Sequence, residues 1–255
     1  MRHRVVVTGM GSLSPLGDSS EQLWDGLMQG RSGIGQISLF DTTDYPVTIA
    51  GEVKDFEPAR WIEAKEVKKL DRFLQLSIAA AVMAVEDSGL EVNESNAQDV
   101  GVYIGSGIGG AGSLCEGSAL LGERGPKRVS PFLIPRILIN LASGHVSILL
   151  GAKGPNFSHV SACATGNHSI GEAMRLIQYG DAKAVVAGGG EAGIIPVSVA
   201  GFAKMRALSQ RNDDPTKASR PFDRDRNGFV MGEGAGIVVL EELEYAKARG
   251  AHIYC

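Results

Sequence analysis

Three short runs of mostly β-branched and small apolar residues, each followed directly by glycine, constrain the fold of this chain most strongly. They span Arg4–Thr8, Val100–Ile104 and Ala182–Ala187. Apolar runs of this length, without polar alternation, are typical of strands buried on both faces of a parallel sheet. A fourth run, Ala235–Glu241, predicts another strand near the end of the chain.

Helical patterns separate these strands. Leu70–Asp87 places apolar residues at helical spacing, and Gly89 follows where such a helix would stop. Four further helices are expected at Glu21–Gln29, Phe132–Leu150 with a break at Pro135, Gly166–Tyr179 and Glu242–Arg249. Ala111–Gly125 contains three internal glycines, so it is expected to be a poor helix. The alternation predicts an α/β fold with a mixed, mostly parallel sheet and helices on both faces.

The bulk composition excludes several classes of protein. The net charge of −4 argues against a nucleic-acid-binding protein. Three widely spaced cysteines form neither a disulfide framework nor a zinc motif, and they favour a reducing compartment, by default the cytoplasm. No stretch approaches the ~18 uninterrupted apolar residues of a membrane span.

The segment around Cys163 is the candidate reactive site. Asn156–Val160 has the character of a short strand, and small residues surround Cys163 before the helix at Gly166–Tyr179 begins. A sharp strand-to-helix turn exposes a nucleophile at the end of a sheet. The helix dipole there favours a thiolate, and backbone N–H groups can bind an oxyanion. Spacing alone does not separate this hypothesis from a small, buried structural cysteine.

Two other motifs have competing interpretations. Gly105, Gly107 and Gly110 form a G-x-G-x-x-G pattern after a strand, but no second strand ending in an acid follows at dinucleotide-binding distance. We therefore disfavour a nucleotide site. Asp223–Gly228 imitates a calcium loop, yet the twelfth position is Gly234 and arginines intervene, so an ordered, salt-bridged loop within Ser209–Asn227 is expected instead.

The residues around Cys163 resemble the nucleophile motif of the β-ketoacyl–acyl-carrier-protein synthases, which have the thiolase-type fold. Nearly the whole chain takes part in the resemblance. The similar segments are Arg4–Gly17, Gly105–Gly110, Ser130–Phe132, Val160–Gly166, Val186–Glu191, Arg206–Ser209, Ser219–Asp223 and Gly228–Gly236. The chain is most similar to the discrete, elongating synthase II type.

The resemblance implies a ping-pong reaction of fatty-acid synthesis. An acyl group moves from acyl-carrier protein to Cys163, and malonyl-carrier protein then loses carbon dioxide and attacks the thioester. No metal or redox cofactor is implied. The family's two assisting histidines and its lysine belong to a second half of the fold. Residues 1–250 are accordingly expected to form the N-terminal domain, and residues 251–255 to begin a second half that is absent, so this chain alone is not expected to complete condensation.

The resemblance also assigns roles to residues away from the nucleophile. Ile108 and Phe202 are expected to line the acyl pocket, and a homodimer is expected. The expected carrier-protein contacts are Lys65, Lys68, Lys69 and Arg206, with Lys127 and Arg128 as further basic residues. An ordinary solvated helix face is the alternative interpretation of these lysines.

Two histidines receive structural interpretations. His168, five residues after Cys163, is off the face of the thiol on a helix, so a packed or surface role is expected. His145 is expected in a core or an interface. Two alternatives to the leading function stay open: a thiolase-like or initiating synthase that uses coenzyme A, and a non-catalytic partner subunit. Exposed apolar surface on this half of the fold is expected to cause self-association.

Overall fold

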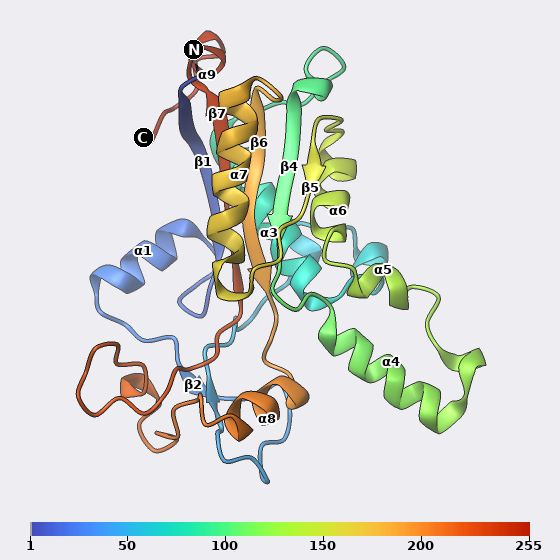
Figure 1. Cartoon of the computed structure of the whole chain (residues 1–255), viewed down its shortest axis with the longest axis vertical. Helices are drawn as coiled ribbons and strands as arrows, with labels where there is room; N and C mark the ends of the chain where they lie inside the picture. The colour runs from blue at the N-terminus through green and yellow to red at the C-terminus, as the bar shows by residue number, and fades with distance from the viewer. Residues whose placement is uncertain (1) are drawn as a thin grey trace. The chain divides into compact units, whose positions relative to one another are not determined.

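The computed structural model describes residues 2–255, which form two compact units. The first unit consists of residues 2–12, 57–191 and 235–255, and the second of residues 13–56 and 192–234. The main sheet, in the first unit, has five strands in the order β1-β7-β6-β4-β5 (Figure 1). In the second unit, a small antiparallel ladder joins β2 to β3.

The strands are β1 (Val5–Leu13), β2 (Gly35–Gln36), β3 (Ile49–Ala50), β4 (Val100–Gly105), β5 (Asn156–Phe157), β6 (Ala184–Glu191) and β7 (Gly234–Glu242). The α-helices are α1 (Ser20–Met28), α2 (Ala64–Val67), α3 (Arg72–Ser88), α4 (Ala111–Arg124), α5 (Leu133–Ile137), α6 (Leu141–Leu150), α7 (Thr165–Tyr179), α8 (Pro196–Lys204) and α9 (Leu243–Ala248). Five single 3₁₀ turns are η1 (Pro58–Arg60), η2 (Ala97–Asp99), η3 (Pro126–Arg128), η4 (Ala162–Ala164) and η5 (Pro215–Lys217).

The sheet of the first unit carries helices on both faces, as the sequence predicts. β4 runs parallel to both β5 and β6. Alternate residues of β6 point to opposite faces: Val185 and Ala187 pack in one cluster with Ile177 of α7, whereas Gly190 approaches Ser77 of α3. Figure 1 shows α7 on one side of this sheet and α3 on the other.

The prediction for Ala111–Gly125 was wrong, because this segment forms the regular helix α4. Each internal glycine costs ~1 kcal/mol relative to alanine. At Gly117, however, an added Cβ would lie 2.9 Å from the side chain of Leu133, so the glycine permits α5 to pack closely on α4. Tertiary packing therefore offsets the low helix propensity.

The expected break at Pro135 was also misplaced. Pro135 lies inside α5, and the chain becomes extended at Leu138 before α6 begins at Leu141. Proline is tolerated in a first turn because the N–H groups there lack a helical acceptor in any case.

The second unit has its own apolar core. Residues of β3, α8 and the neighbouring loops form it, among them Val47, Ile49, Val199 and Leu208. The polar segment Ser209–Asn227 is an ordered loop closed by a hydrogen bond of 2.7 Å from Ser209 Oγ to Asn227 Oδ1.

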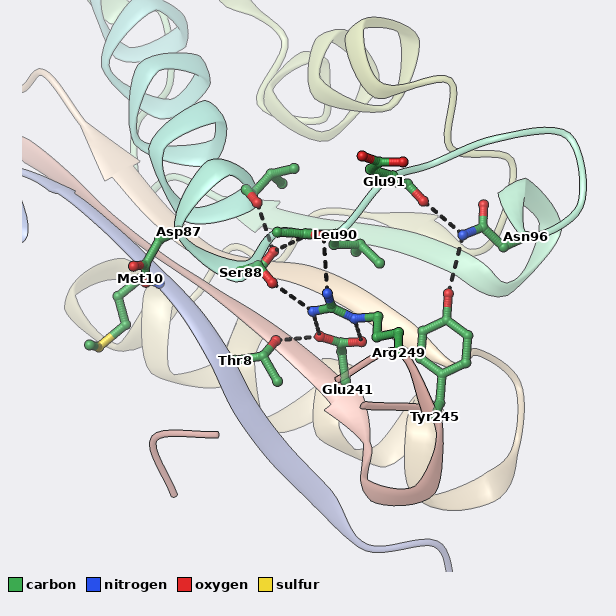
Figure 2. A network of polar contacts seen from close by, with 12 residues as sticks. Thr8, Met10, Asp87, Ser88, Leu90, Glu91, Asn96, Glu241, Tyr245 and Arg249 are labelled. Atoms are coloured by element: carbon green, nitrogen blue, oxygen red, sulfur yellow. Dashed lines mark hydrogen bonds and ion pairs between the residues drawn. The ribbon is translucent and has the colours of Figure 1, made fainter. Parts of the chain in front are cut away.

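A buried ion pair lies where β7 and α9 meet α3 (Figure 2). The side chain of Glu241 is fully buried, and Arg249 donates to it from Nε at 2.8 Å and from Nη2 at 2.5 Å. Arg249 also donates to the carbonyls of Ser88 and Gly89 at the end of α3, and the Thr8 hydroxyl donates to Glu241. This network joins β1, β7, the end of α9 and the end of α3.

Among residues 2–255, no helix combines the length and the apolarity that crossing a membrane would require. Residues 251–255 form no helix or strand, although the N–H of Tyr254 donates to the carbonyl of Val7 on β1.

Candidate active site

Cys163 lies in a strained turn between β5 and α7. It is the middle residue of the 3₁₀ turn η4, and its side chain is exposed. The preceding residue, Ala162, has φ of +50°, a left-handed conformation that costs an L-residue roughly 1–2 kcal/mol. Such strain persists where the surroundings enforce it, and it is frequent at functional sites.

Ser161 holds the entrance to this turn. Its N–H donates to Thr165 Oγ1 at 2.9 Å, and its hydroxyl lies 2.7 Å from Nδ1 of His168. The carbonyl of Ser161 accepts from the N–H of Ala164 at 3.1 Å. One residue thus makes three hydrogen bonds to the turn and to the first turns of α7.

The N-terminus of α7 faces this turn without a side-chain cap. Its N-cap residue is Ala164, and the first turn contains no acidic residue. The N–H groups of an uncapped helix start attract negative charge, and the dipole of a 15-residue helix adds to this effect. The arrangement suits a thiolate or an oxyanion on the carbonyl of a bound acyl group.

Glycines let α7 begin close to the sheet. A Cβ on Gly105, the last residue of β4, would lie 2.4 Å from the carbonyl oxygen of His159 and 2.4 Å from Cγ2 of Thr165. A Cβ on Gly189 would lie 3.1 Å from Cα of Gly166. Real Cβ atoms do not lie at 2.4 Å from such neighbours, so glycine is required at position 105, and a side chain at position 189 would be tightly packed.

Glu191, at the end of β6, binds the glycine-rich loop that follows β4. Its carboxylate accepts from Ser106 Oγ at 3.0 Å, from the N–H of Gly107 at 2.7 Å and from the N–H of Ile108 at 3.1 Å. A side-chain carboxylate therefore occupies the backbone donors that a phosphate would use in the nucleotide hypothesis. The sequence analysis found Glu191 only as part of a motif, because this contact joins residues more than eighty positions apart.

The same loop lies close to the nucleophile turn. A Cβ on Gly107 would lie 3.6 Å from the carbonyl oxygen and 3.7 Å from Cα of Ala162. Ile108, an expected acyl-pocket residue, is the next residue and its side chain is 42% exposed. The loop therefore carries Ile108 directly beside the residues that hold Cys163.

Phe202, the other expected pocket residue, belongs to α8 in the second unit. Its ring packs edge-on against Phe229, with 5.4 Å between the ring centroids, and it borders the core of that unit.

The expected carrier-protein contacts are exposed or half-buried. In the first unit, Lys65 and Lys69 form ion pairs of 2.7 Å with Glu63 and Glu66. Lys68 is exposed, and its carbonyl accepts from the Arg136 guanidinium of α5. The remaining basic residues, Lys127, Arg128 and, in the second unit, Arg206, are also exposed.

In the segment that resembles a calcium loop, the first carboxylate, that of Asp223, accepts hydrogen bonds from neighbouring residues of the same loop. Asp223 accepts from the N–H of Asp225 at 2.7 Å and from Arg220 at 3.1 Å. These hydrogen bonds, that of the Asp225 N–H first, lower the pKa of Asp223. The loop therefore has the salt-bridged form that the sequence indicates.

His145 lies half-buried in α6, where burial lowers its pKa and the charge of Glu66 partly opposes that shift. His168, by contrast, is exposed and bonded to Ser161. This exposure agrees with the packed or surface role expected for His168, whereas its contact with Ser161, before the helix, was not predicted.

Fold and site together define an α/β protein with a thiolase-type half-fold and a cysteine at the start of a helix. A family model, the N-terminal domain of beta-ketoacyl synthases, matches residues 2–246. The chain belongs to this family, as the resemblance in its sequence indicated.

Relatives and solved structures agree with this assignment. The 3-oxoacyl-[acyl-carrier-protein] synthase 2 proteins of Synechocystis and Vibrio cholerae are each 54% identical over 99% of this chain and 61% of their own length. A beta-ketoacyl synthase of Burkholderia phymatum superimposes with a TM-score of 0.89 at 33% identity, over 99% of this chain and 62% of that one. A ketosynthase solved with a type II PKS acyl-carrier protein gives a TM-score of 0.83 at 31% identity, over 100% of this chain and 62% of that one.

The chain thus spans about three fifths of the length of the curated relatives that it matches.

Proposed function

We propose that this chain provides the nucleophile of a cytoplasmic 3-oxoacyl-acyl-carrier-protein synthase of fatty-acid synthesis. The observation that carries the proposal is the placement of Cys163: an exposed thiol in a strained turn, at the uncapped N-terminus of α7. Relatives named 3-oxoacyl-[acyl-carrier-protein] synthase 2 support the choice of substrate class.

In the loading step, the Cys163 thiolate attacks the carbonyl carbon of an acyl thioester on the carrier protein. A new carbon–sulfur bond forms, the negative charge passes to the carbonyl oxygen, and first-turn N–H groups of α7 stabilise it. The tetrahedral intermediate then collapses, the bond to the carrier protein's sulfur breaks, and the departing thiolate takes a proton from solvent. In the second step, malonyl-carrier protein loses carbon dioxide, and its carbanion attacks the Cys163 thioester to give the β-ketoacyl product and the free thiolate.

Carrier protein is the proposed partner, and the basic residues Lys65, Lys68, Lys69 and Arg206 are its proposed contacts. Glu63 and Glu66 already neutralise part of the charge on Lys65 and Lys69. Among these three lysines, Lys68 is therefore the one at which charge reversal should weaken binding of the carrier protein most. Ile108 and Phe202 are the proposed acyl-pocket residues.

A homodimer is proposed through the β5 edge of the sheet. β5 is the last strand in the order, and an unpaired edge can pair with a second copy. Phe157 on β5 is 52% exposed, and Ile148 and Leu149 on the adjacent α6 are 79% and 54% exposed. Apolar surface of this kind, next to an open edge, favours association.

Sedimentation velocity tests the dimer. Ile148→Lys and Phe157→Lys should shift the chain to the monomer, whereas Leu121→Lys, at a similarly exposed apolar position of α4, should leave the dimer intact. A wild-type monomer, or dimers in all three variants, would remove this part of the proposal.

Intact-mass spectrometry after incubation with acyl-carrier protein tests the loading step. We expect an acyl-sized mass gain on the wild-type chain and on Cys115→Ala, a variant of another exposed cysteine, but no gain on Cys163→Ala. Loading from acyl-coenzyme A in preference to carrier protein would favour the initiating-synthase alternative. No gain on any variant would favour the non-catalytic partner subunit.

A further inference from the structure

His168 contacts the nucleophile turn through a hydrogen bond to Ser161. Both side chains are accessible to solvent, so packing of α7 in the core does not account for this contact. We infer that Ser161 and His168 form a positioning pair, which holds the strained turn so that the Cys163 thiol stays at the N-terminus of α7. This inference rests on the proposed role of Cys163 as the acyl acceptor.

The strain in the turn requires such a restraint. Ser161 has φ of −147° and ψ of 43°, and Ala162 follows at φ of +50°. A non-glycine residue adopts this conformation only when neighbouring contacts enforce it. Two of the three hydrogen bonds of Ser161 are directed to one rigid element, because Thr165 and His168 both lie on α7.

α7 is a suitable anchor for these bonds. Thr165 is only 4% exposed, and Ala173 and Ile177 further along the helix are fully buried against the sheet. A hydrogen bond to α7 therefore fixes Ser161 relative to the whole first unit.

The His168 ring is itself oriented by a neighbour. It packs edge-on against the ring of His159, with 5.1 Å between the centroids and 72° between the planes. His159 in turn lies 6.5 Å from the ring of Tyr103 on β4. The imidazole thus stands between the chain that leads into the turn and the hydroxyl of Ser161.

The chemistry of the bond suits a tether. With the neutral ring, the Ser161 hydroxyl donates to an unprotonated Nδ1, or a protonated Nδ1 donates to the hydroxyl. With the charged ring, Nδ1–H again donates to the hydroxyl. The bond survives in each state, and it occupies the nitrogen next to the turn. His168 can therefore restrain the turn through Ser161 in every protonation state of its ring.

Alkylation of Cys163 by iodoacetamide provides the test. The second-order rate is measured on the full chain from pH 6 to 10 by peptide mass spectrometry, with the exposed Cys115 and Cys255 as internal references. Ser161→Ala and His168→Ala should each slow alkylation of Cys163 about fivefold at neutral pH, the factor that corresponds to ~1 kcal/mol for one lost hydrogen bond. The pH midpoint of the reaction should rise in both, because the thiolate moves away from the helix start.

A conservative variant separates positioning from a general structural effect. Asn places an amide near the position of Nδ1, so His168→Asn should return the rate to within about twofold of the wild type. The double variant Ser161→Ala/His168→Ala should be no slower than either single variant, because both remove one bond. His252→Ala, which removes an imidazole from another ring contact of the first unit, should leave Cys163 unaffected.

Two results would overturn the inference: unchanged rates and midpoints in Ser161→Ala and His168→Ala, or no recovery in His168→Asn. Failure of the proposed function has a different signature, because the wild-type chain would then not take up an acyl group from carrier protein, and its Cys163 would react no faster than Cys115.

Discussion

Removal of Arg249 should destabilise the first unit more than its partly exposed position suggests. Arg249→Met deletes the cation that faces the fully buried carboxylate of Glu241, and it also deletes two hydrogen bonds to the last carbonyls of α3 (Figure 2). Removing one partner of a buried ion pair costs roughly 3–5 kcal/mol, since the other charge stays without compensation. Arg249 retains 21% side-chain exposure, so we expect the lower end, about 3 kcal/mol.

Urea unfolding and differential scanning calorimetry measure this effect. A loss of about 3 kcal/mol corresponds to a decrease in Tm of roughly 6–12 °C for a chain of this size. Lys247→Met is the matched control, because Lys247 lies on the same helix and pairs with Glu244 at 2.9 Å in solvent. An exposed pair of this kind contributes ~0–1 kcal/mol.

A second substitution identifies the cause. Adding Glu241→Gln to Arg249→Met removes the uncompensated charge and keeps an acceptor for the Thr8 hydroxyl. The double variant should therefore regain part of the lost stability. If Arg249→Met lost no more stability than Lys247→Met, or if the second substitution recovered none, the reasoning from an unpaired buried charge would be refuted.

Two further predictions follow from the packing and the titration of the first unit. Gly105→Ala would place a methyl group 2.4 Å from the carbonyl oxygen of His159 and 2.4 Å from Cγ2 of Thr165. Urea unfolding should therefore show a free energy of unfolding lower by at least about 1–3 kcal/mol. A variant as stable as the wild type would contradict the close approach of α7 to β4. Burial lowers the pKa of His145 below its ordinary value of about 6.5, so the unfolded chain takes up a proton at this ring before the folded chain does as the pH falls. The stability that the neutral ring contributes is therefore complete above pH 6.5, and it is lost as the pH falls from there through the folded-state pKa. The Tm of His145→Gln should consequently fall less than that of the wild type between pH 7.5 and 5.5, and parallel falls would exclude His145 as the titrating group.

Local patterns were sufficient for much of this fold. The strands were predicted because each is an apolar run of adjacent residues, and α7 begins within one residue of its predicted start. The expected stop at glycine is correct only for β4, because β1 and β6 continue through their glycines to Leu13 and Glu191. The helix α4 was missed because its glycines are favourable only against Leu133 of another helix. No local propensity contains that information.

The contacts around Cys163 also depend on residues that local sequence patterns do not relate to one another. The turn was predictable from its small residues, but the strain at Ala162 and the bond between Ser161 and His168 depend on how the chain enters the helix. Helical spacing describes only residues within α7. That spacing relates His168 to Cys163, five residues earlier, and contains no information about Ser161.

The parallel order of β4, β5 and β6 explains why these distant residues meet. Neighbouring parallel strands end at the same edge of a sheet, where α/β proteins bind their ligands. The loop after β4 supplies Ile108, the turn after β5 supplies Cys163, and the end of β6 supplies Glu191, whose carboxylate fixes the loop of Ile108 against the turn. The position of the thiol is thus determined at the ends of three neighbouring strands, β6, β4 and β5. A substitution at Glu191 should therefore disturb Cys163 through the loop.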